Sequence, residues 1–338
     1  MLNNSNIDSD YKLYRKFFLL SVLFTLIFIS TFFKSLSVDY INYVREINVI
    51  FFNKSLYSYT LEPTFYLLVL MSQLFFHENI TFIFFIYSIL GISLKFFSFN
   101  KLSYYPLFSV IIYSLSYYWL HDFTQIRAGV ASAIFLCSIQ DIFERNFFKF
   151  LLKIIFATLF HYSAILYFPL YFIYNRKLEL IYYLLPIIGL FSILTNLSSD
   201  FLSIIIKFLP FFIQVKLGIY IDLSNKHFFP HTNVFNLFYT SLLILFYFLI
   251  FTTRKKLKID LIFYLKILSV SIFSFYFFSS IPVLAFRISE LYDIVILILF
   301  PNVISIYKEK YVFFVFFFFY FLLYFINFAI IQHALNIL

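Results

Sequence analysis

The chain has 338 residues, of which 63% are hydrophobic and 12% charged, with a mean hydropathy of +0.94. This composition excludes a water-soluble domain, which needs far more polar residues to cover its surface. The formal net charge of +9 does not indicate nucleic acid as a partner, because the basic residues form short clusters between long apolar runs, as in cytoplasmic loops. Those runs do not alternate, which excludes a transmembrane β-barrel. We therefore expect an all-α, polytopic integral membrane protein.

The N-terminal segment predicts a first membrane helix that begins in the cytoplasm. The apolar segment 17–33 follows a basic cluster at 12–16, so residues 1–16 are expected to be a cytoplasmic tail. No small-residue cleavage site follows, and we expect the segment to be kept rather than removed as a signal peptide. The polar stretch 34–62 is then expected to be an extracytoplasmic loop.

The next segments predict one short helix and three crossings. Segment 63–76 is too short for a core of about 30 Å and predicts a re-entrant or interfacial helix. Lys95 and Lys101 are expected on the cytoplasmic side, and residues 121–124 as a tight outer turn. The three predicted crossings are 80–94, 104–120 and 125–142.

Segment 154–174 allows two interpretations. It is long enough to cross once, but His161 and a proline interrupt it, so two half-helices that dip and return fit equally well. The same choice applies to segments 180–194 and 201–213. Either choice leaves residues 214–233 as an extracytoplasmic loop.

The C-terminal third contains the strongest cytoplasmic marker, a basic cluster at 254–258 that follows the apolar segment 236–251. The turn at 282–287 is expected to lie outside. The whole chain, residues 1–338, is expected to be one transmembrane domain of about 9–11 helices. The last three predicted crossings are 261–278, 291–306 and 312–331.

Other features of the sequence indicate neither a metal nor a cofactor. The single cysteine, Cys137, lies in an apolar run and predicts an inert buried thiol. The acidic tripeptide 8–10 lies in the predicted cytoplasmic tail, so we do not interpret it as a metal site for a nucleotide sugar. We expect no metal ion and no other cofactor.

A few polar residues interrupt the apolar runs, and the predicted topology places nearly all of them toward the outer side. Charges within or beside membrane helices are costly, so such residues are candidates for function. Asp39 and Tyr43 would share a face if their segment is helical. The candidates are Asp39, Tyr40, Tyr43, Glu62, Gln125, Arg127, His161, Arg287 and Glu290.

Several candidates also have an ordinary structural explanation. Glu62 precedes a proline, which is typical of a helix start. Arg127 can snorkel, although it lies far from the cytoplasmic basic clusters. His161 can be a hydrogen-bonded core residue. Glu290 lies three residues after Arg287 and can pair with it.

Two arginines, carboxylates and a histidine near one membrane face suit glycosyl transfer from a polyprenyl-pyrophosphate donor. The planar guanidinium group recognises phosphate. A carboxylate or a neutral imidazole can remove a proton from an attacking sugar hydroxyl. The arginines would stabilise the negative charge that develops on the departing pyrophosphate.

Several short motifs occur in a fixed order along the chain. They are Asp39-Tyr40-x-x-Tyr43, Leu61-Glu62-Pro63-x-Phe65-Tyr66, Ile126-Arg127-x-x-x-Ala131, Phe160-His161-Tyr162-Ser163-Ala164, and Arg287 with Tyr292. Together they resemble the EpsG-like branch of the Wzy-type polysaccharide polymerases, well over residues 39–169 and by hydropathy beyond. The chain departs from that pattern at Val38 and Ala128, where the family often has Gly and Gln, so the family's glutamine corresponds at best to the displaced Gln125.

The resemblance implies a metal-independent polymerase with a membrane fold like that of the C-type glycosyltransferases. Such enzymes join undecaprenyl-pyrophosphate-linked oligosaccharides at the outer face of the bacterial cytoplasmic membrane, for capsule, exopolysaccharide or O-antigen, and a chain-length regulator can be a further partner. It implies pyrophosphate binding by Arg127 and Arg287, and a base among His161, Glu62 and Asp39. The remaining expected substrate contacts are Tyr40, Tyr43 and Gln125.

Two other classes of protein remain as alternatives. A membrane O-acyltransferase would also use an intramembrane histidine, with an opening toward the cytoplasm. A flippase for lipid-linked oligosaccharides would need a polar cavity at the midplane and internal repeats, and the sequence has no evident repeat.

Overall fold

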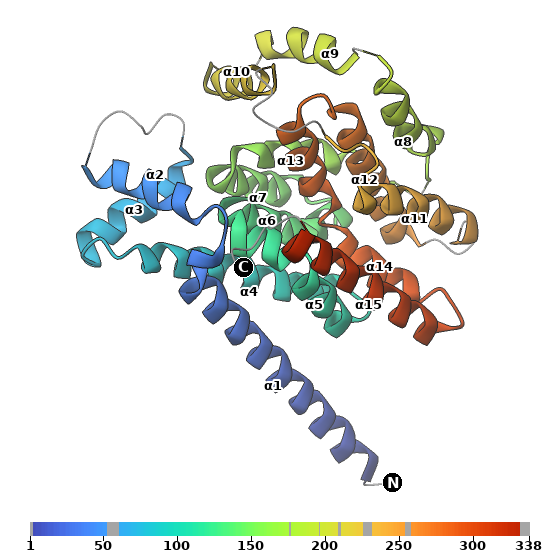
Figure 1. The fold of residues 1–338 in the computed structure, drawn as a ribbon. Coiled ribbons are helices and arrows are strands. Elements are labelled where there is room, and N and C mark those ends of the chain that lie inside the picture. The colour runs from blue at the N-terminus through green and yellow to red at the C-terminus, as the bar shows by residue number, and fades with distance from the viewer. Residues whose placement is uncertain are drawn as a thin grey trace.

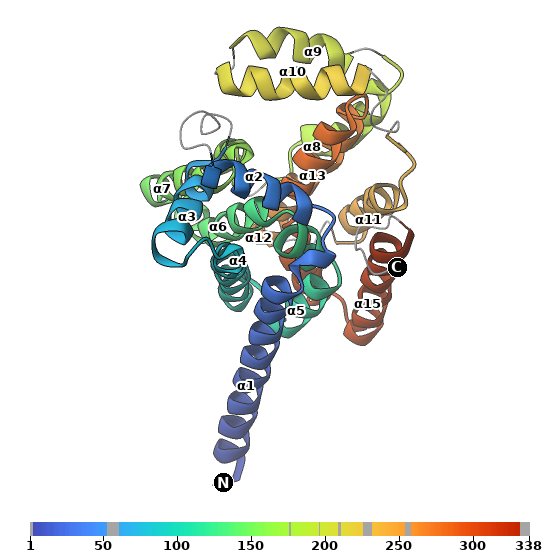
Figure 2. The same ribbon diagram turned by 60° about the vertical axis from the view of Figure 1, so that its left-hand side comes forward.

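The structure, a computed structural model, describes residues 3–52, 61–175, 177–195, 197–208, 211–225, 232–253 and 258–331. These residues are almost entirely helical, and no strand occurs among them. Figures 1 and 2 show a bundle from which α1 projects at one end, while α9 and α10 lie at the opposite end.

The helices follow the chain in short, closely spaced segments. The first half contains α1 Asn3–Phe32, η1 Lys34–Leu36, α2 Tyr40–Phe52, α3 Pro63–Phe75, α4 Ile80–Leu102, α5 Pro106–Leu115, the π-helix η2 Tyr118–Thr124, α6 Ile126–Phe143, α7 Phe147–Phe160 and η3 Tyr162–Tyr171. The second half contains α8 Leu180–Ser192, α9 Leu197–Ile205, η4 Ile206–Phe208, α10 Phe211–Asn225, α11 Leu237–Thr253, α12 Ile259–Phe277, α13 Pro282–Asp293, α14 Ile296–Ile304, α15 Lys310–Ile326 and η5 Asn327–Ile331.

The prediction of an all-α polytopic membrane protein is confirmed. Within the described ranges, five helices are long and apolar enough to cross a membrane, and four shorter apolar helices accompany them. The predicted total of about 9–11 crossings stays a prediction, as does the side of the membrane on which each loop lies. The five candidate spans are Leu13–Phe32, Ile80–Leu102, Ile126–Phe143, Ile259–Phe277 and Lys310–Ile330.

Helix α6 lies at the centre of the bundle. It packs against α4 on one side and α7 on another, and most of its side chains are buried. Its first two turns carry Ala128, Gly129 and Ala131, and small residues let helix backbones approach closely. Because α6 is rigidly enclosed, the residues at its N-terminal end have well-defined positions.

Two predicted loop features are wrong. Residues 121–124, expected as a tight outer turn, belong to η2, and His121 and Asp122 are buried there. Lys95, expected at a cytoplasmic boundary, lies inside α4, which continues for seven residues beyond it. Its ammonium group is fully buried and lies 2.7 Å from the Asp122 carboxylate, which offsets the desolvation of both charges.

Other segments expected as loops are also helical. Residues 282–287, expected as a turn, form the start of α13. The expected loop 34–62 contains α2, and the expected loop 214–233 contains most of α10. Residues 53–60 and 226–231 of these two segments lie outside the described residues. The sequence did not predict these short helices, because polar residues interrupt their apolar pattern.

The ambiguous segment 154–174 is broken in two. Helix α7 ends at Phe160, His161 is extended, and the 3₁₀ helix η3 follows and packs back against α7. The guanidinium group of Arg145, just before α7, donates to the carbonyl of Tyr174, just after η3. This hydrogen bond joins residues on either side of α7 and η3. The single crossing and the pair of half-helices that dip and return both stay predictions.

Candidate active site

Arg127 lies in the first turn of α6 and is held by two carboxylates. One guanidinium nitrogen is 2.7 Å from Glu62, and another is 2.9 Å from Glu46 of α2. The Glu62 side chain is only 4% exposed and that of Glu46 is 31% exposed. The guanidinium group also lies over the rings of Tyr43 and Phe65, 5.2 and 4.8 Å from their centres, at cation–π distance.

Glu62 begins α3, as its position before a proline predicts, but its side chain does not cap that helix. Extended backbone dihedral angles at Glu62 leave the carboxylate free to turn toward α6 and α7. One oxygen reaches Arg127, and the other lies 3.4 Å from Nδ1 of His161. The backbone of Glu62 therefore starts a helix, as expected. Its carboxylate links Arg127 with His161.

His161 owes its position to the end of α7. Its backbone is extended, with φ −154° and ψ 115°, so the chain breaks there and the imidazole faces Glu62. Burial lowers the pKa of His161, Glu62 opposes this effect, and the charges of Arg287 and Arg127 lower the pKa further. The neutral imidazole is the form that can accept a proton. Catalytic hydrogen bonds are often long before substrate binds, and the 3.4 Å contact fits that pattern.

Arg287, Glu290 and Gln125 form a second group beside the first. Arg287 of α13 is exposed, and it donates to the hydroxyl of Tyr220 of α10 at 2.9 Å. The Glu290 carboxylate accepts a hydrogen bond from Gln125, which precedes α6, at 3.2 Å. The structure therefore pairs Glu290 with Gln125 rather than with Arg287. Among the residues that the structure describes, the hydrogen-bond partner of Arg287 is this neutral hydroxyl.

Two other candidates, Asp39 and Tyr40, lie at the N-terminal end of α2. Asp39 precedes this helix and its carbonyl accepts the first N–H groups, while the Tyr40 ring packs 5.9 Å from that of Phe84. Asp39 is seven positions before Glu46, about 10 Å along the helix axis. Tyr43 is brought to Arg127, whereas Asp39 and Tyr40 are at the far end of α2. Their expected roles stay predictions.

Sequence reasoning missed Glu46, and it named Tyr162 in a motif without giving it a role. Glu46 looked like one more polar residue in a loop, although it follows Asp39 and Tyr43 at helical spacing. The Tyr162 hydroxyl donates to the carbonyl of Leu61 at 2.9 Å and so ties the residue after His161 to the residue before Glu62. Within the described part of the chain, no three His, Cys, Asp or Glu side chains gather to hold a metal ion.

Glu290 predicts a pH dependence of stability. Burial raises its pKa from 4.5 to about 7, opposed by the hydrogen bond from Gln125 and the charge of Arg287. Between these values the folded state keeps a proton that the unfolded state has lost, so stability falls as pH rises from about 5 to 7. The variant Glu290→Gln lacks this dependence, and we expect its Tm to rise relative to the wild type over that range.

The measurement is thermal unfolding of the purified protein in detergent at several pH values. The control is Glu309→Gln, which removes an exposed carboxylate and should shift Tm by the same amount at every pH. A Glu290→Gln difference that stays constant from pH 5 to 7.5 would contradict the prediction.

Comparison with known proteins identifies the family of the chain. The sequence profile of the EpsG family matches residues 16–337. The amylovoran biosynthesis protein AmsC of Erwinia amylovora is 32% identical over 122 residues, which are 35% of this chain and 32% of that protein. The matched region thus spans about a third of the relative's length. No solved structure matches the chain significantly. Because the family profile covers nearly all of the sequence, the chain belongs to the EpsG family.

Proposed function

We propose that this protein is a polysaccharide polymerase, a metal-independent glycosyltransferase that joins lipid-pyrophosphate-linked oligosaccharides at the outer face of the bacterial cytoplasmic membrane. Membership of the EpsG family and the similarity to an amylovoran biosynthesis protein support a role in exopolysaccharide biosynthesis. The observation that carries the finer proposal is the contact of Glu62 with both Arg127 and His161. It joins polar residues of α3, α6 and the α7 terminus into one site.

His161 is the base in this proposal. Its Nδ1 faces Glu62, so a proton on Nδ1 directs the free electron pair of Nε2 toward substrate. Nε2 removes the proton from the acceptor hydroxyl as that oxygen forms a bond to the anomeric carbon of the donor. The bond from that carbon to the pyrophosphate oxygen breaks, and the lipid pyrophosphate departs.

The two arginines take different roles. Arg127 already has two carboxylate partners, so we assign it to holding Glu62 in place rather than to binding the pyrophosphate. Among the described residues the hydrogen-bond partner of Arg287 is a neutral hydroxyl, and its charge lowers the pKa of His161. A guanidinium group at that place can stabilise the developing pyrophosphate charge. Arg287 therefore binds the leaving group.

The test is replacement of the chromosomal gene by His161→Gln. We expect long polysaccharide to disappear while a single lipid-linked repeat unit accumulates, because base catalysis contributes about 10²–10⁴-fold in rate. The control is His77→Asn, which replaces an exposed histidine at a positive φ that asparagine tolerates. Gel profiles of the polysaccharide and analysis of extracted lipid-linked sugars measure the outcome.

Other outcomes identify the alternatives. Polysaccharide of normal length that lacks acetyl groups would overturn the proposal in favour of an O-acyltransferase. Lipid-linked repeat units that accumulate only on the cytoplasmic side would indicate a flippase.

A further inference from the structure

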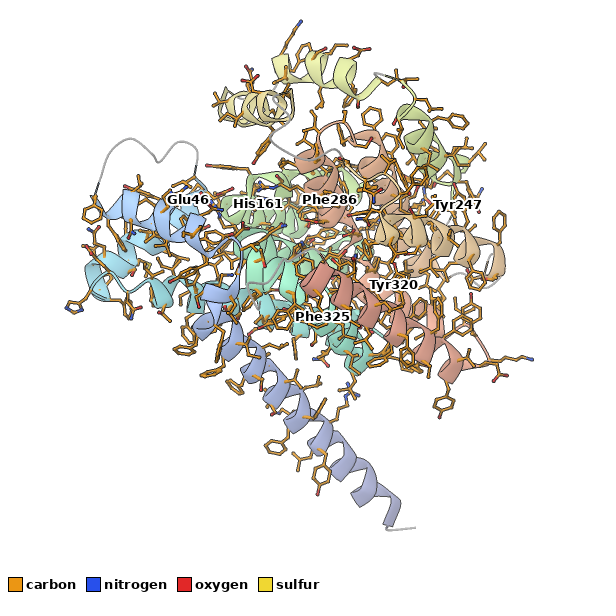
Figure 3. All side chains as sticks on the ribbon, viewed as in Figure 1. Glu46, His161, Tyr247, Phe286, Tyr320 and Phe325 are labelled. Atoms are coloured by element: carbon orange, nitrogen blue, oxygen red, sulfur yellow. The ribbon has the colours of Figure 1, made fainter. Side chains whose placement is uncertain are left out.

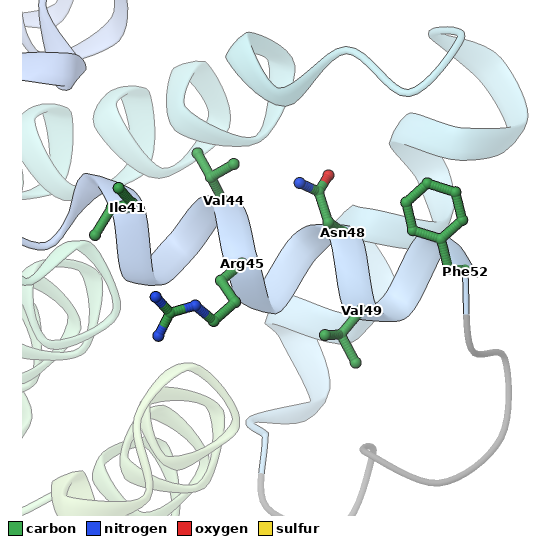
Figure 4. A pocket seen from close by; sticks show the side chains of 6 residues that line it. All are labelled: Ile41, Val44, Arg45, Asn48, Val49 and Phe52. Atoms are coloured by element: carbon green, nitrogen blue, oxygen red, sulfur yellow. The ribbon is translucent and has the colours of Figure 1, made fainter.

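The face of α2 that points away from the protein core forms a hollow, and the proposed reaction gives this hollow no role. It has a volume of about 370 Å³, near the lower end of the range of about 300–1,000 Å³ for small-ligand sites. Every lining residue comes from α2 and faces away from the core residues Tyr43 and Ile47. The lining residues, drawn in Figure 4, are Ile41, Val44, Arg45, Asn48, Val49 and Phe52.

The lining combines apolar side chains with one cation. Ile41 and Phe52 are 66% and 83% exposed, near the two ends of the hollow, and Arg45 lies between them. Arg127, Arg145 and Arg287 each donate to a carboxylate, carbonyl or hydroxyl. Within the described ranges Arg45 has no such partner. An apolar surface around an uncompensated guanidinium group fits a ligand with a hydrocarbon chain and an anionic head.

The proposed function, on which this inference rests, needs two such ligands at once. A polymerase that joins two lipid-linked oligosaccharides releases the pyrophosphate of the donor and keeps the pyrophosphate of the acceptor. The first must lie beside the reacting carbon, and Arg287 is suited to it because its charge reaches His161. The second is separated from its attacking hydroxyl by the length of a repeat unit, so it binds farther from His161.

The hollow lies on a helix that borders the candidate active site, because Glu46 of α2 pairs with Arg127. Figure 3 shows His161 between Glu46 of α2 and Phe286 of α13. Arg45 is the neighbour of Glu46, and Arg287 is the neighbour of Phe286. The two arginines therefore belong to two helices that each contribute to the site, since Glu46 of α2 pairs with Arg127 and Glu290 of α13 pairs with Gln125. Glu46 shares the charge of Arg127 with Glu62, which reduces its repulsion of an anion at Arg45.

We propose that the outward face of α2 binds the polyprenyl pyrophosphate of the acceptor substrate. Arg45 holds the phosphates, and Ile41, Val49 and Phe52 hold the first isoprene units. This arrangement anchors the acceptor lipid on α2 while its sugar end extends toward His161. It also explains why a helix whose inner face supports Arg127 keeps an apolar outer face with one arginine.

The test counts lipid pyrophosphates on the full-length protein in phosphatidylcholine nanodiscs. Undecaprenyl pyrophosphate is added, and native mass spectrometry reports the number bound. We expect two on the wild type. In Arg45→Ala one site should weaken about 10- to 100-fold, as for loss of a charge-assisted hydrogen bond, and Arg45→Lys should weaken it less. The control is Asn42→Ala, an exposed α2 residue outside the hollow, which should keep both sites.

Several results would overturn the inference. Unchanged binding of two molecules by Arg45→Ala would do so, and so would a wild type that binds fewer than two. Phosphatidylglycerol that occupies the same site with the same dependence on Arg45 would indicate an ordinary lipid head group instead. If the inference fails in any of these ways while His161→Gln still blocks polymerisation in cells, the proposed function stands without it.

Discussion

Glu62→Gln should reduce the rate of polymer formation by about 10²–10⁴-fold, the usual contribution of general acid–base catalysis. Glu62 is the one carboxylate that contacts both Arg127 and His161 in the described structure. Glutamine keeps the size of the side chain but loses the charge that orients the imidazole and opposes the effect of burial on its pKa. The measurement is polymer formation from lipid-linked repeat units in isolated membranes.

The matched control is Glu46→Gln. Glu46 also pairs with Arg127, but it is more exposed than Glu62 and belongs to a different helix. Water screens exposed ion pairs, so we expect a loss below about tenfold. Equal losses in the two variants would show that the carboxylates act only by holding Arg127, and would remove the role of Glu62 on His161.

Asp122→Ala should lower the free energy of unfolding by about 3–5 kcal/mol, the effect of removing one partner of a buried ion pair. Lys95 is fully buried, and it donates to Asp122 at 2.7 Å and to the carbonyl of Gly129 at 2.8 Å. The hydroxyl of Tyr113 also donates to Asp122 at 2.7 Å. Loss of the carboxylate leaves a buried ammonium group without its counter-charge.

The measurement is thermal unfolding in detergent together with the fraction of monodisperse protein. The double variant Lys95→Met with Asp122→Ala removes both charges and should recover part of the loss, since apolar replacement of a buried pair is often nearly neutral. Gly91→Ala should also destabilise, because a Cβ there would clash with the Asp122 carboxylate. A double variant as unstable as the single one would contradict the role assigned to the ion pair.

The class of protein and several helices follow from the amino-acid sequence alone. The expected segments 63–76 and 125–142 correspond to α3 Pro63–Phe75 and α6 Ile126–Phe143. Long apolar runs bounded by prolines or polar residues define such helices locally, because the bilayer requires each run to satisfy its own backbone. The presence of ionisable residues within or beside apolar runs was also enough to identify Glu62, Arg127 and His161 as candidate site residues.

How those residues combine depends on the packing of the helices. Glu46 and Arg127 are 81 positions apart, and Arg127 and Glu62 are 65 apart. Local periodicity carries no information about pairs so distant. For the same reason Lys95 resembled a loop residue until packing placed Asp122 beside it. Hydropathy depends on each residue and its near neighbours, whereas the pairing of buried charges depends on which helices meet.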